Sequence, residues 1–316
     1  IGHGSYGCVY KPPPKCKKIE DCPFTEEKCV KGVAKLISEQ YADEEVEHVL
    51  GIDKIDLIQK YHIGDPAYCD PEDTFDTSDC SAVENETDVK FLIYGDGGTI
   101  FDNFIKLDNI DIIKFIEGFA NIFFAIKEMS NNGFVHADIK FDNIMVNDEY
   151  NFKLIDFGIS WDTIPIINTD YEIWPPEYAL LGSQENGDTY KDVIRLLNTN
   201  KKIIFRDKFV KMLGKDISDE FWNKFKHTSG KKTFKIIKSK VDLYSLGIMI
   251  KKYILITTPI NDDIAEGGAT YGADFCQRSH IKNFFKSPPM IKLVERMTDE
   301  DFYERYTPQQ AYDRYL

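Results

Sequence analysis

The sequence predicts an α+β fold of two lobes, a small first lobe rich in β-strands and a larger, mainly α-helical second lobe. A chain of 316 residues is long enough for two separate cores, and an apolar content of 42% is that of a globular protein. Short apolar runs broken by glycine-containing turns occupy residues 1–95, whereas the apolar positions of 111–132 recur at helical spacing. We therefore place the first lobe at 1–95 and the second at 96–316.

The chain opens on a glycine-rich motif, IGHGSYGCV, with glycines at 2, 4 and 7 ahead of Val9. Glycine lets backbone amides approach a phosphate where a Cβ atom would clash. A glycine-rich hairpin is the alternative, while a dinucleotide-binding fingerprint is disfavoured because the following YKPPPKCKK cannot begin a helix. Because the first residue is Ile1 and not Met, we expect the first strand to lack upstream residues.

A lysine, Lys35, stands in the middle of a short apolar strand, GVAKLI. A buried ammonium needs an anionic partner, because an unpaired buried charge is costly. The next segment, 38–55, is predicted to be helical, with an apolar face formed by Val46, Val49, Leu50 and Ile52. The acidic partners that it offers are Glu39, Glu44, Glu45 and Glu47. We prefer Glu45, since Val49 lies one turn further along the same side, and Glu44 and Glu47 remain alternatives.

The cysteines indicate free thiols in a reducing compartment. They are odd in number, and a chain of this size does not need disulfides; their positions are 8, 16, 22, 29, 69, 80 and 276. Cys16, Cys22 and Cys29 fall in the proline- and lysine-rich run 12–31 without a CxxC pair, which favours loop thiols over a metal site. The acidic segment 64–88 is predicted to be an exposed loop; it lacks the glycine and terminal glutamate of an EF-hand calcium loop.

Charge and hydropathy exclude several classes of function. The net charge of −14 argues against a nucleic-acid-binding surface. Charged residues interrupt every apolar run before it reaches the roughly 20 residues of a membrane span, and there is no signal-peptide pattern. We therefore expect neither a nucleic-acid partner nor a membrane span.

Three oxygen-bearing side chains, Asp138, Asn143 and Asp156, recur in the stretch HADIKFDNIMVNDEYNFKLIDFG at 136–158. Mg²⁺ bound with a nucleotide takes one or two protein oxygens, which Asn143 and Asp156 could supply, and Asp138 could then face an incoming hydroxyl. Turn-forming roles are the alternative for each residue alone. The helix over 111–132, ended by Asn132 and Gly133, would support the stretch with a core of Phe115, Phe119 and Phe123.

Seven motifs, in order along nearly the whole chain, resemble those of the protein kinase family. GHGSYGCV resembles the glycine-rich loop, VAK the strand with the phosphate-anchoring lysine, HADIKFDN the catalytic loop and DFG the metal loop. WPPE resembles the segment usually written APE, VDLYSLGIM the DxxSxG helix and YERYTPQQAYDRYL the C-terminal helix pair. GSYGCVYKPP and HADIKFDNIMV are particularly similar to kinases of large cytoplasmic DNA viruses, which implies a host-cytoplasmic or virion location.

The resemblance implies a bilobal protein-kinase-like fold with ATP in the cleft and its adenine against the 92–98 connector. Lys35 would bind the α- and β-phosphates and pair with Glu45. Asn143 and Asp156 would hold Mg²⁺ or Mn²⁺. Asp138 would accept the substrate proton, and Lys140 would neutralise the transferring phosphoryl group. The other residues that it places around ATP are Ile1, Gly2, Gly4, Ser5, Tyr6, Gly7, Val9 and Ala34. Asp242 would anchor the catalytic loop, and Glu177 would pair with Arg305 to brace the substrate platform.

Lys140, two residues after Asp138, resembles the serine/threonine-specific arrangement, although tyrosine or dual specificity stays open. Ala137 stands where most regulated kinases have the arginine that receives an activation-loop phosphate. We therefore expect a serine/threonine protein kinase whose activity does not require phosphorylation of Thr163, Thr169 or Tyr171.

Between Glu177 and Asp242 the chain is longer than the family's usual connection, which indicates an insertion at 180–238 that could dock a partner or be an ornamental helical excursion. The alternative function is that of a pseudokinase, an ATP-binding or scaffolding module without turnover. The presence of Lys35, Asp138, Asn143 and Asp156 disfavours that alternative.

Overall fold

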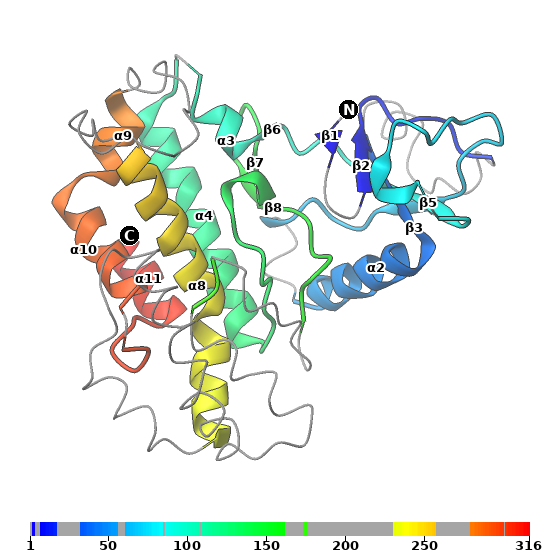
Figure 1. Cartoon of the computed structure of the whole chain (residues 1–316). Helices are drawn as coiled ribbons and strands as arrows, with labels where there is room; N and C mark the ends of the chain where they lie inside the picture. Colours follow the sequence, from blue (N-terminus) through cyan, green and yellow to red (C-terminus); the bar gives the residue numbers. More distant parts are fainter. Residues whose placement is uncertain are drawn as a thin grey trace, which may run out of the picture. The chain divides into compact units, whose positions relative to one another are not determined.

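In the computed structural model the chain divides into two compact units (Figure 1). Unit 1 comprises Ile1–Thr99 and Met145–Ile159, and unit 2 comprises Ile100–Ile144 and Ser160–Leu316. The structure describes residues 2–3, 7–17, 32–55, 61–84, 86–107, 109–161, 173–175, 230–256, 279–299 and 301–316. Most of the expected insertion at 180–238 lies outside these residues, as do Glu177, Thr163, Thr169 and Tyr171. Sheets together with several helices confirm the predicted α+β class.

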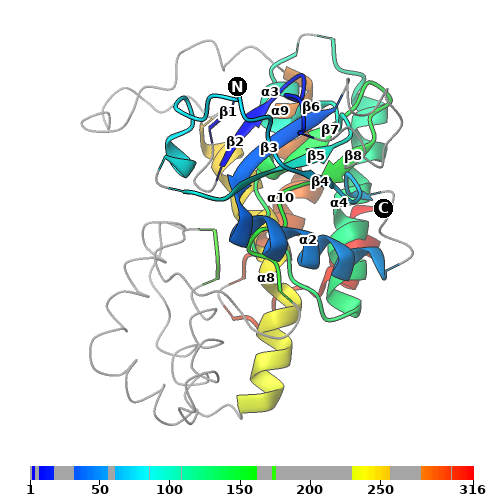
Figure 2. The same cartoon turned by 90° about the vertical axis from the view of Figure 1, so that its right-hand side faces the viewer.

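The main sheet of unit 1 has five antiparallel strands in the order β1-β2-β3-β5-β4. Their bounds are Gly2–His3, Gly7–Tyr10, Val33–Ser38, Val89–Tyr94 and Ala67–Cys69 in that order. Figure 2 shows β3 and β5 side by side. Lys35 lies in the central strand β3, opposite Val9 of β2 and Leu92 of β5. The strand predicted at GVAKLI is confirmed.

One face of this sheet packs against helix α2, Glu39–Asp53. Because side chains alternate along a strand, Ile37 and Leu92 point to this face, and they contact Ala42 of the helix. The buried positions of α2 recur every three or four residues at Ala42, Glu45, Val49 and Ile52. The predicted helix is confirmed, but its predicted apolar face is wrong at Leu50, which is 48% exposed.

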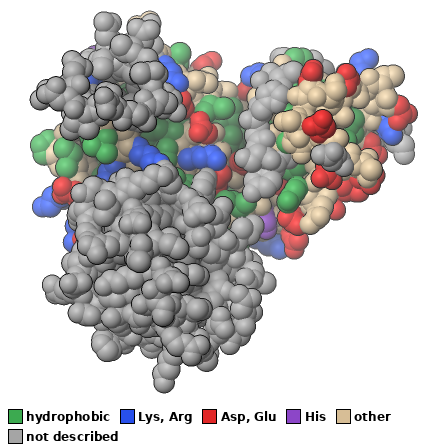
Figure 3. Space-filling model, viewed as in Figure 1, with side chains coloured by type: hydrophobic (Ala, Val, Ile, Leu, Met, Phe, Trp, Pro, Cys, Tyr) green, Lys and Arg blue, Asp and Glu red, His purple; other side chains and the backbone are tan. Residues whose placement is uncertain are grey.

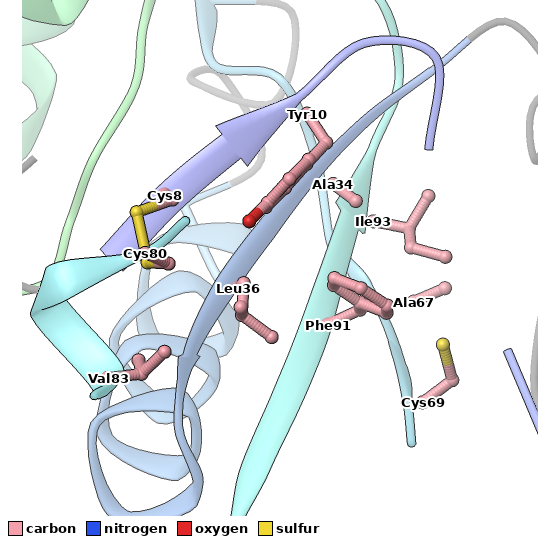
Figure 4. Close-up of a cluster of buried hydrophobic side chains, with 10 residues drawn as sticks. All are labelled: Cys8, Tyr10, Ala34, Leu36, Ala67, Cys69, Cys80, Val83, Phe91 and Ile93. Atoms are coloured by element: carbon pink, nitrogen blue, oxygen red, sulfur yellow. A yellow bond between two sulfur atoms is a disulfide. The ribbon is translucent and has the colours of Figure 1, made fainter. Parts of the chain in front are cut away.

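The opposite face of the sheet is covered by the segment that was predicted to be an exposed acidic loop. Strand β4 and the short helix η3, Ser81–Val83, belong to this segment. Few of its residues are apolar, but they are buried against the sheet in a second core (Figure 4). That core consists of Cys8, Tyr10, Ala34, Leu36, Ala67, Cys69, Cys80, Val83, Phe91 and Ile93. The prediction of a wholly exposed loop is therefore wrong.

Two disulfides fasten this covering segment to the rest of unit 1. Cys8 of β2 is bonded to Cys80, 72 residues later, and Cys16 is bonded to Cys69, 53 residues later. The prediction of free thiols is wrong for these four residues. The whole chain is large, but unit 1 has the small core for which cross-links matter most. Cys22, Cys29 and Cys276 lie outside the described residues.

A three-stranded sheet has the order β6-β7-β8, with bounds Thr99–Ile100, Ile144–Val146 and Phe152–Leu154. The connector that precedes β6 contains Gly98, whose φ is +101°. A Cβ atom at this position would lie 2.3 Å from the carbonyl oxygen of Val146. Only glycine satisfies both the backbone conformation and the close approach.

Unit 2 is built around helix α4, Ile112–Asn131, which fulfils the prediction for 111–132. Asp111 caps it by accepting hydrogen bonds from two backbone amides, and Gly133 follows with a φ of +72°. The predicted core residues Phe115, Phe119 and Phe123 are buried. The other helices among the described residues of unit 2 are α3 (Phe101–Phe104), η4 (Phe141–Asn143), α8 (Gly230–Ile256), α9 (Ser279–Phe285), α10 (Pro288–Met297) and α11 (Pro308–Tyr315).

Helices α8 and α11 both pack on α4, and α8 lies beside α4 in both views (Figures 1 and 2). Phe285 of α9 and Tyr315 of α11 contact the ring of Phe119 in the centre of this core. Their packing gives α8 a defined position, and Asp242 lies near its middle. No helix in the described part of the chain has the length and the apolar run needed to cross a bilayer.

Candidate active site

The candidate site of unit 1 is centred on Lys35, whose ammonium contacts two carboxylates. Its Nζ atom lies 2.6 Å from Glu45 Oε2 and 2.9 Å from Asp156 Oδ1. Tyr94 donates a hydrogen bond of 2.7 Å to the other oxygen of Glu45. Of the glutamates that the sequence offered, Glu45 is therefore the one in contact with the lysine.

Electrostatics hold this group of side chains together. Burial alone would lower the pKa of Lys35, but the charges of Glu45 and Asp156 outweigh it and raise that pKa well above its usual range. Burial, reinforced by Glu45, also raises the pKa of Tyr94 far above its usual value. At neutral pH the lysine is thus a fixed cation and the tyrosine a neutral donor.

The chain brings Lys35 and Glu45 together through the alternation of strand β3. Leu36 points to the covered face of the sheet, so Lys35 points to the face on which α2 packs. Glu45 is only 1% exposed because it lies on the buried side of α2, one turn before Val49. Burial of a carboxylate is tolerated here because it is paired.

The glycine-rich motif is described only in part. Gly2 lies in β1, and Gly7 and Val9 lie in β2, whereas Ile1, Gly4, Ser5 and Tyr6 lie outside the described residues. A Cβ atom at Gly7 would lie 2.3 Å from the carbonyl oxygen of Leu36, so this glycine is required for strand packing whatever its role toward a phosphate. Ala34 is fully buried on the face of β3 that the segment 64–88 covers, opposite the face on which α2 packs.

The candidate site of unit 2 is the loop that contains Asp138, Lys140 and Asn143. Asp138 Oδ2 accepts hydrogen bonds from Lys140 Nζ at 2.9 Å and from Asn143 Nδ2 at 2.7 Å. The same amide nitrogen donates to the backbone carbonyl of Asp138 at 3.0 Å. The three side chains predicted from this loop therefore form one hydrogen-bonded group around the carboxylate.

The backbone of this loop is held on both sides of Ala137, which has a left-handed φ of 65°. The carboxylate of Asp242 accepts the backbone amides of His136 and Ala137, at 2.8 and 2.9 Å. Burial raises the pKa of Asp242, and these two hydrogen bonds oppose the rise. The indole of Trp174 donates to the carbonyl of Ala137. Asp242 takes the anchoring position that the sequence assigned to it, whereas no specific contact had been predicted for Trp174.

Asn143 of unit 2 and Asp156 of unit 1 each offer an oxygen atom of the kind that binds a divalent cation. Asn143 turns its amide nitrogen to Asp138, and no described residue donates to its amide oxygen. Asp156 supplies a carboxylate whose side chain is 38% exposed. Carboxylate and amide oxygens suit Mg²⁺ in the presence of a nucleotide. Within the described ranges, no three His, Cys, Asp or Glu residues cluster as a metal site of protein ligands alone.

A second ionisable cluster of unit 1 joins Asp53, at the end of α2, to His62 and Asp65. His62 Nε2 lies 2.8 Å from Asp53 Oδ1, although the geometry is not that of a hydrogen bond. Burial lowers the pKa of His62 to about 4. A hydrogen bond to Asp53, with burial, raises the pKa of Asp65 to about 6. Because these shifts have opposite signs, their effects on the pH dependence of stability oppose each other.

Replacing Asp65 separates the two effects. The folded state binds more protons at Asp65 than the unfolded state between pH 3.8 and about 6, so the contribution of Asp65 to stability falls as the pH rises through 6. Asp65→Asn mimics the protonated form of Asp65. We expect its free energy of unfolding to exceed that of wild type by about 1 kcal/mol at pH 8, after discounting for solvent screening, and to equal that of wild type at pH 4. Thermal unfolding at the two pH values measures this. A variant less stable than wild type at pH 8 would contradict the hydrogen bond between the Asp65 and Asp53 carboxyl groups.

Several known kinases resemble the chain, each over only part of its length. The chain is 34% identical over 68 residues to the maternal embryonic leucine zipper kinase of Danio rerio, covering 22% of the chain and 10% of the relative. It is 24% identical over 178 residues to a probable serine/threonine-protein kinase of Dictyostelium discoideum, covering 55% and 32%. It is 32% identical over 102 residues to serine/threonine-protein kinase PKH2 of Saccharomyces cerevisiae, covering 32% and 9%.

The matched stretches thus span between 9% and 32% of the lengths of these relatives. No protein-family model matches the chain. The similarities nevertheless come from several serine/threonine kinases, and together they support a place for this chain in the protein kinase family.

Proposed function

We propose that the chain is an ATP-dependent protein kinase that transfers the γ-phosphoryl group to a serine or threonine hydroxyl of a protein substrate. The observation that carries the proposal is the contact of Lys35 with Glu45 at 2.6 Å and with Asp156 at 2.9 Å. A cation held between two carboxylates keeps its charge and its position, and phosphoryl transfer asks a protein mainly for positioned charge. The kinase relatives add support.

Each side chain takes the role that its chemistry allows. Lys35 binds phosphate oxygens of ATP, and Asp156 and Asn143 hold Mg²⁺ or Mn²⁺, which when bound neutralises phosphate charge. Asp138 accepts or orients the proton of the substrate hydroxyl. Lys140, 2.9 Å from Asp138, neutralises charge on the transferring group and is the residue that favours serine and threonine acceptors.

A transfer assay tests this function. The purified chain is incubated with γ-labelled ATP, Mg²⁺ and generic serine/threonine or tyrosine substrates. We expect label on serine or threonine and none without the divalent cation. Nucleotide binding without transfer by folded protein would overturn the enzyme proposal in favour of an ATP-binding or scaffolding module. Whether the insertion at 180–238 docks the substrate stays a prediction, because most of it lies outside the described residues.

We also infer that the activity does not depend on a phosphorylated activation segment. The loop carries Ala137 where a phosphate-receiving arginine would stand. The contacts that support the proposal involve no phosphate. The Trp174 indole donates to the backbone carbonyl of Ala137, and the Asp242 carboxylate accepts the backbone amide of Ala137. Ser245 holds the neighbouring carbonyl of Ile173 at 3.0 Å. These contacts position the loop without a phosphate.

Phosphatase treatment tests this inference directly. We expect the dephosphorylated chain to keep its full transfer rate, because none of the contacts around Ala137 requires a phosphoryl group. The rate is measured before and after treatment, with mass spectrometry of the segment that holds Thr163, Thr169 and Tyr171 to verify removal. Complete loss of activity would contradict the inference.

A further inference from the structure

Helix α2 reaches the dipeptide Asp156–Phe157 by a second route, which the roles above do not use. His48 Nδ1 lies 3.0 Å from the carbonyl oxygen of Phe157. Glu45, three residues earlier, makes the first connection through Lys35 to the Asp156 carboxylate. Because residues three apart share one side of a helix, both side chains reach the same loop. The helix therefore contacts the peptide that follows Asp156 directly.

The backbone of this dipeptide is in a conformation that needs support. Asp156 has a φ of +62°, in the left-handed region that residues with side chains rarely adopt. Such a conformation persists where surrounding contacts determine it from several sides. The ring of Phe157 is buried and meets the ring of His62 edge-on at 6.1 Å. His48 holds the carbonyl of the same residue.

We propose that His48 is a positioning residue, whose Nδ1–H donates to the Phe157 carbonyl and so holds the Asp156 carboxylate in place against Lys35 and toward a divalent cation. The proposal rests on the kinase function proposed above. Helix α2 would then position two groups of the site: the Lys35 ammonium through Glu45, and the Asp156 carboxylate through His48.

The contact also determines the state of the imidazole. A carbonyl oxygen only accepts hydrogen bonds, so Nδ1 of His48 has to carry a proton. This requirement holds without nucleotide, metal or substrate. It can therefore be measured apart from any activity.

Three substitutions separate the hydrogen bond from the bulk of the side chain. His48→Asn keeps an N–H donor near the position of Nδ1, whereas His48→Leu keeps apolar bulk and removes the donor. Glu47→Asn is the matched control, because Glu47 is exposed on the same helix and the variant places the same asparagine next to position 48.

We expect His48→Leu to lower kcat about tenfold, the effect of one lost hydrogen bond, and to raise the Mg²⁺ concentration for half-maximal rate. The KM for the peptide substrate should not change, and the melting temperature should match that of the control. His48→Asn should recover most of kcat. A merely structural role would instead lower the melting temperature and leave the Mg²⁺ dependence unchanged.

Two readouts do not need turnover. In protein labelled with ¹⁵N-histidine, the signals lost in His48→Asn should be those of a ring protonated at Nδ1. Calorimetric titration with ATP should show that His48→Leu weakens the Mg²⁺-dependent part of binding. Each of three results would overturn the proposal. The first is an Nδ1 without a proton, and the second is a kcat and Mg²⁺ dependence of His48→Leu equal to those of wild type. The third is an equal loss of kcat in His48→Leu and His48→Asn. If wild type transfers no phosphate, the kinase function fails, and the imidazole and titration results still decide whether His48 positions Asp156.

Discussion

Asp138→Asn is expected to lower the rate of phosphoryl transfer by about 10²- to 10⁴-fold while the fold remains intact. Asparagine has the same shape, and its oxygen can still accept from Lys140 and Asn143, which donate to Asp138 at 2.9 and 2.7 Å. It cannot accept the proton of a substrate hydroxyl, and it removes the charge that orients that hydroxyl. The measurement is the transfer rate at saturating ATP, together with the melting temperature.

Asp142→Asn is the matched control for this experiment. Asp142 belongs to the same loop, but it makes none of the hydrogen bonds around Asp138. Its replacement should keep the wild-type rate. If Asp138→Asn also kept that rate, Asp138 would not act on the substrate proton. If both variants lost activity and melted early, the loss would come from damage to the loop.

Removing the disulfide between Cys8 and Cys80 is expected to lower the free energy of unfolding by about 2–5 kcal/mol. The bond joins residues 72 apart in the sequence, and both cysteines are fully buried in the second core of unit 1 (Figure 4). Without it, η3 and the turn before it lose their covalent tie to β2, and the covering segment keeps its apolar contacts, the pairing of β4 with β5 and the disulfide between Cys16 and Cys69. The measurement is urea unfolding of the double variant Cys8→Ser/Cys80→Ser beside wild type.

Reducing conditions provide the control for the disulfide. With an excess of dithiol, the difference in free energy of unfolding between wild type and the double variant should largely disappear. The disulfides of wild type are then reduced, and only the packing difference between cysteine and serine remains. A wild type whose unfolding does not respond to the dithiol would show that this bond does not stabilise the chain. The glycine-bearing strand β2 contains Cys8, so nucleotide binding is measured on the same samples.

The acidic character of unit 1 illustrates how a correct observation led to a wrong structural prediction. Acidic side chains are prominent on the face of this unit drawn in Figure 3. The many acidic residues of 64–88 favour an exposed loop. Its few apolar residues, such as Val83 at 2% exposure, are nevertheless enough to cover the sheet. Which face of a segment is buried depends on its neighbour, and that neighbour is distant in the sequence.

The contact of Lys35 with Glu45 could be predicted because both ends obey local periodicities. Strand alternation sends Lys35 toward α2, and helical spacing puts Glu45 beside Val49 on the buried side. The left-handed backbones of Asp156 and Ala137 had no comparable signal, because alanine disfavours that conformation and aspartate adopts it only occasionally. The contacts of His48 and Trp174 depend on those backbones and could not be predicted either.

The α+β class, the strand of Lys35 and the helices predicted over 38–55 and 111–132 could be read from the sequence alone, as could the residues that carry the candidate chemistry. These features depend on residue type and on spacing within one element, which a sequence displays. The pairing of the cysteines, the covering of the sheet and the contacts of Asp156 and Asp138 became visible only in the folded chain. Those features depend on which distant residues meet in space. A few apolar side chains that become buried determine these meetings, however rare such side chains are in the segment.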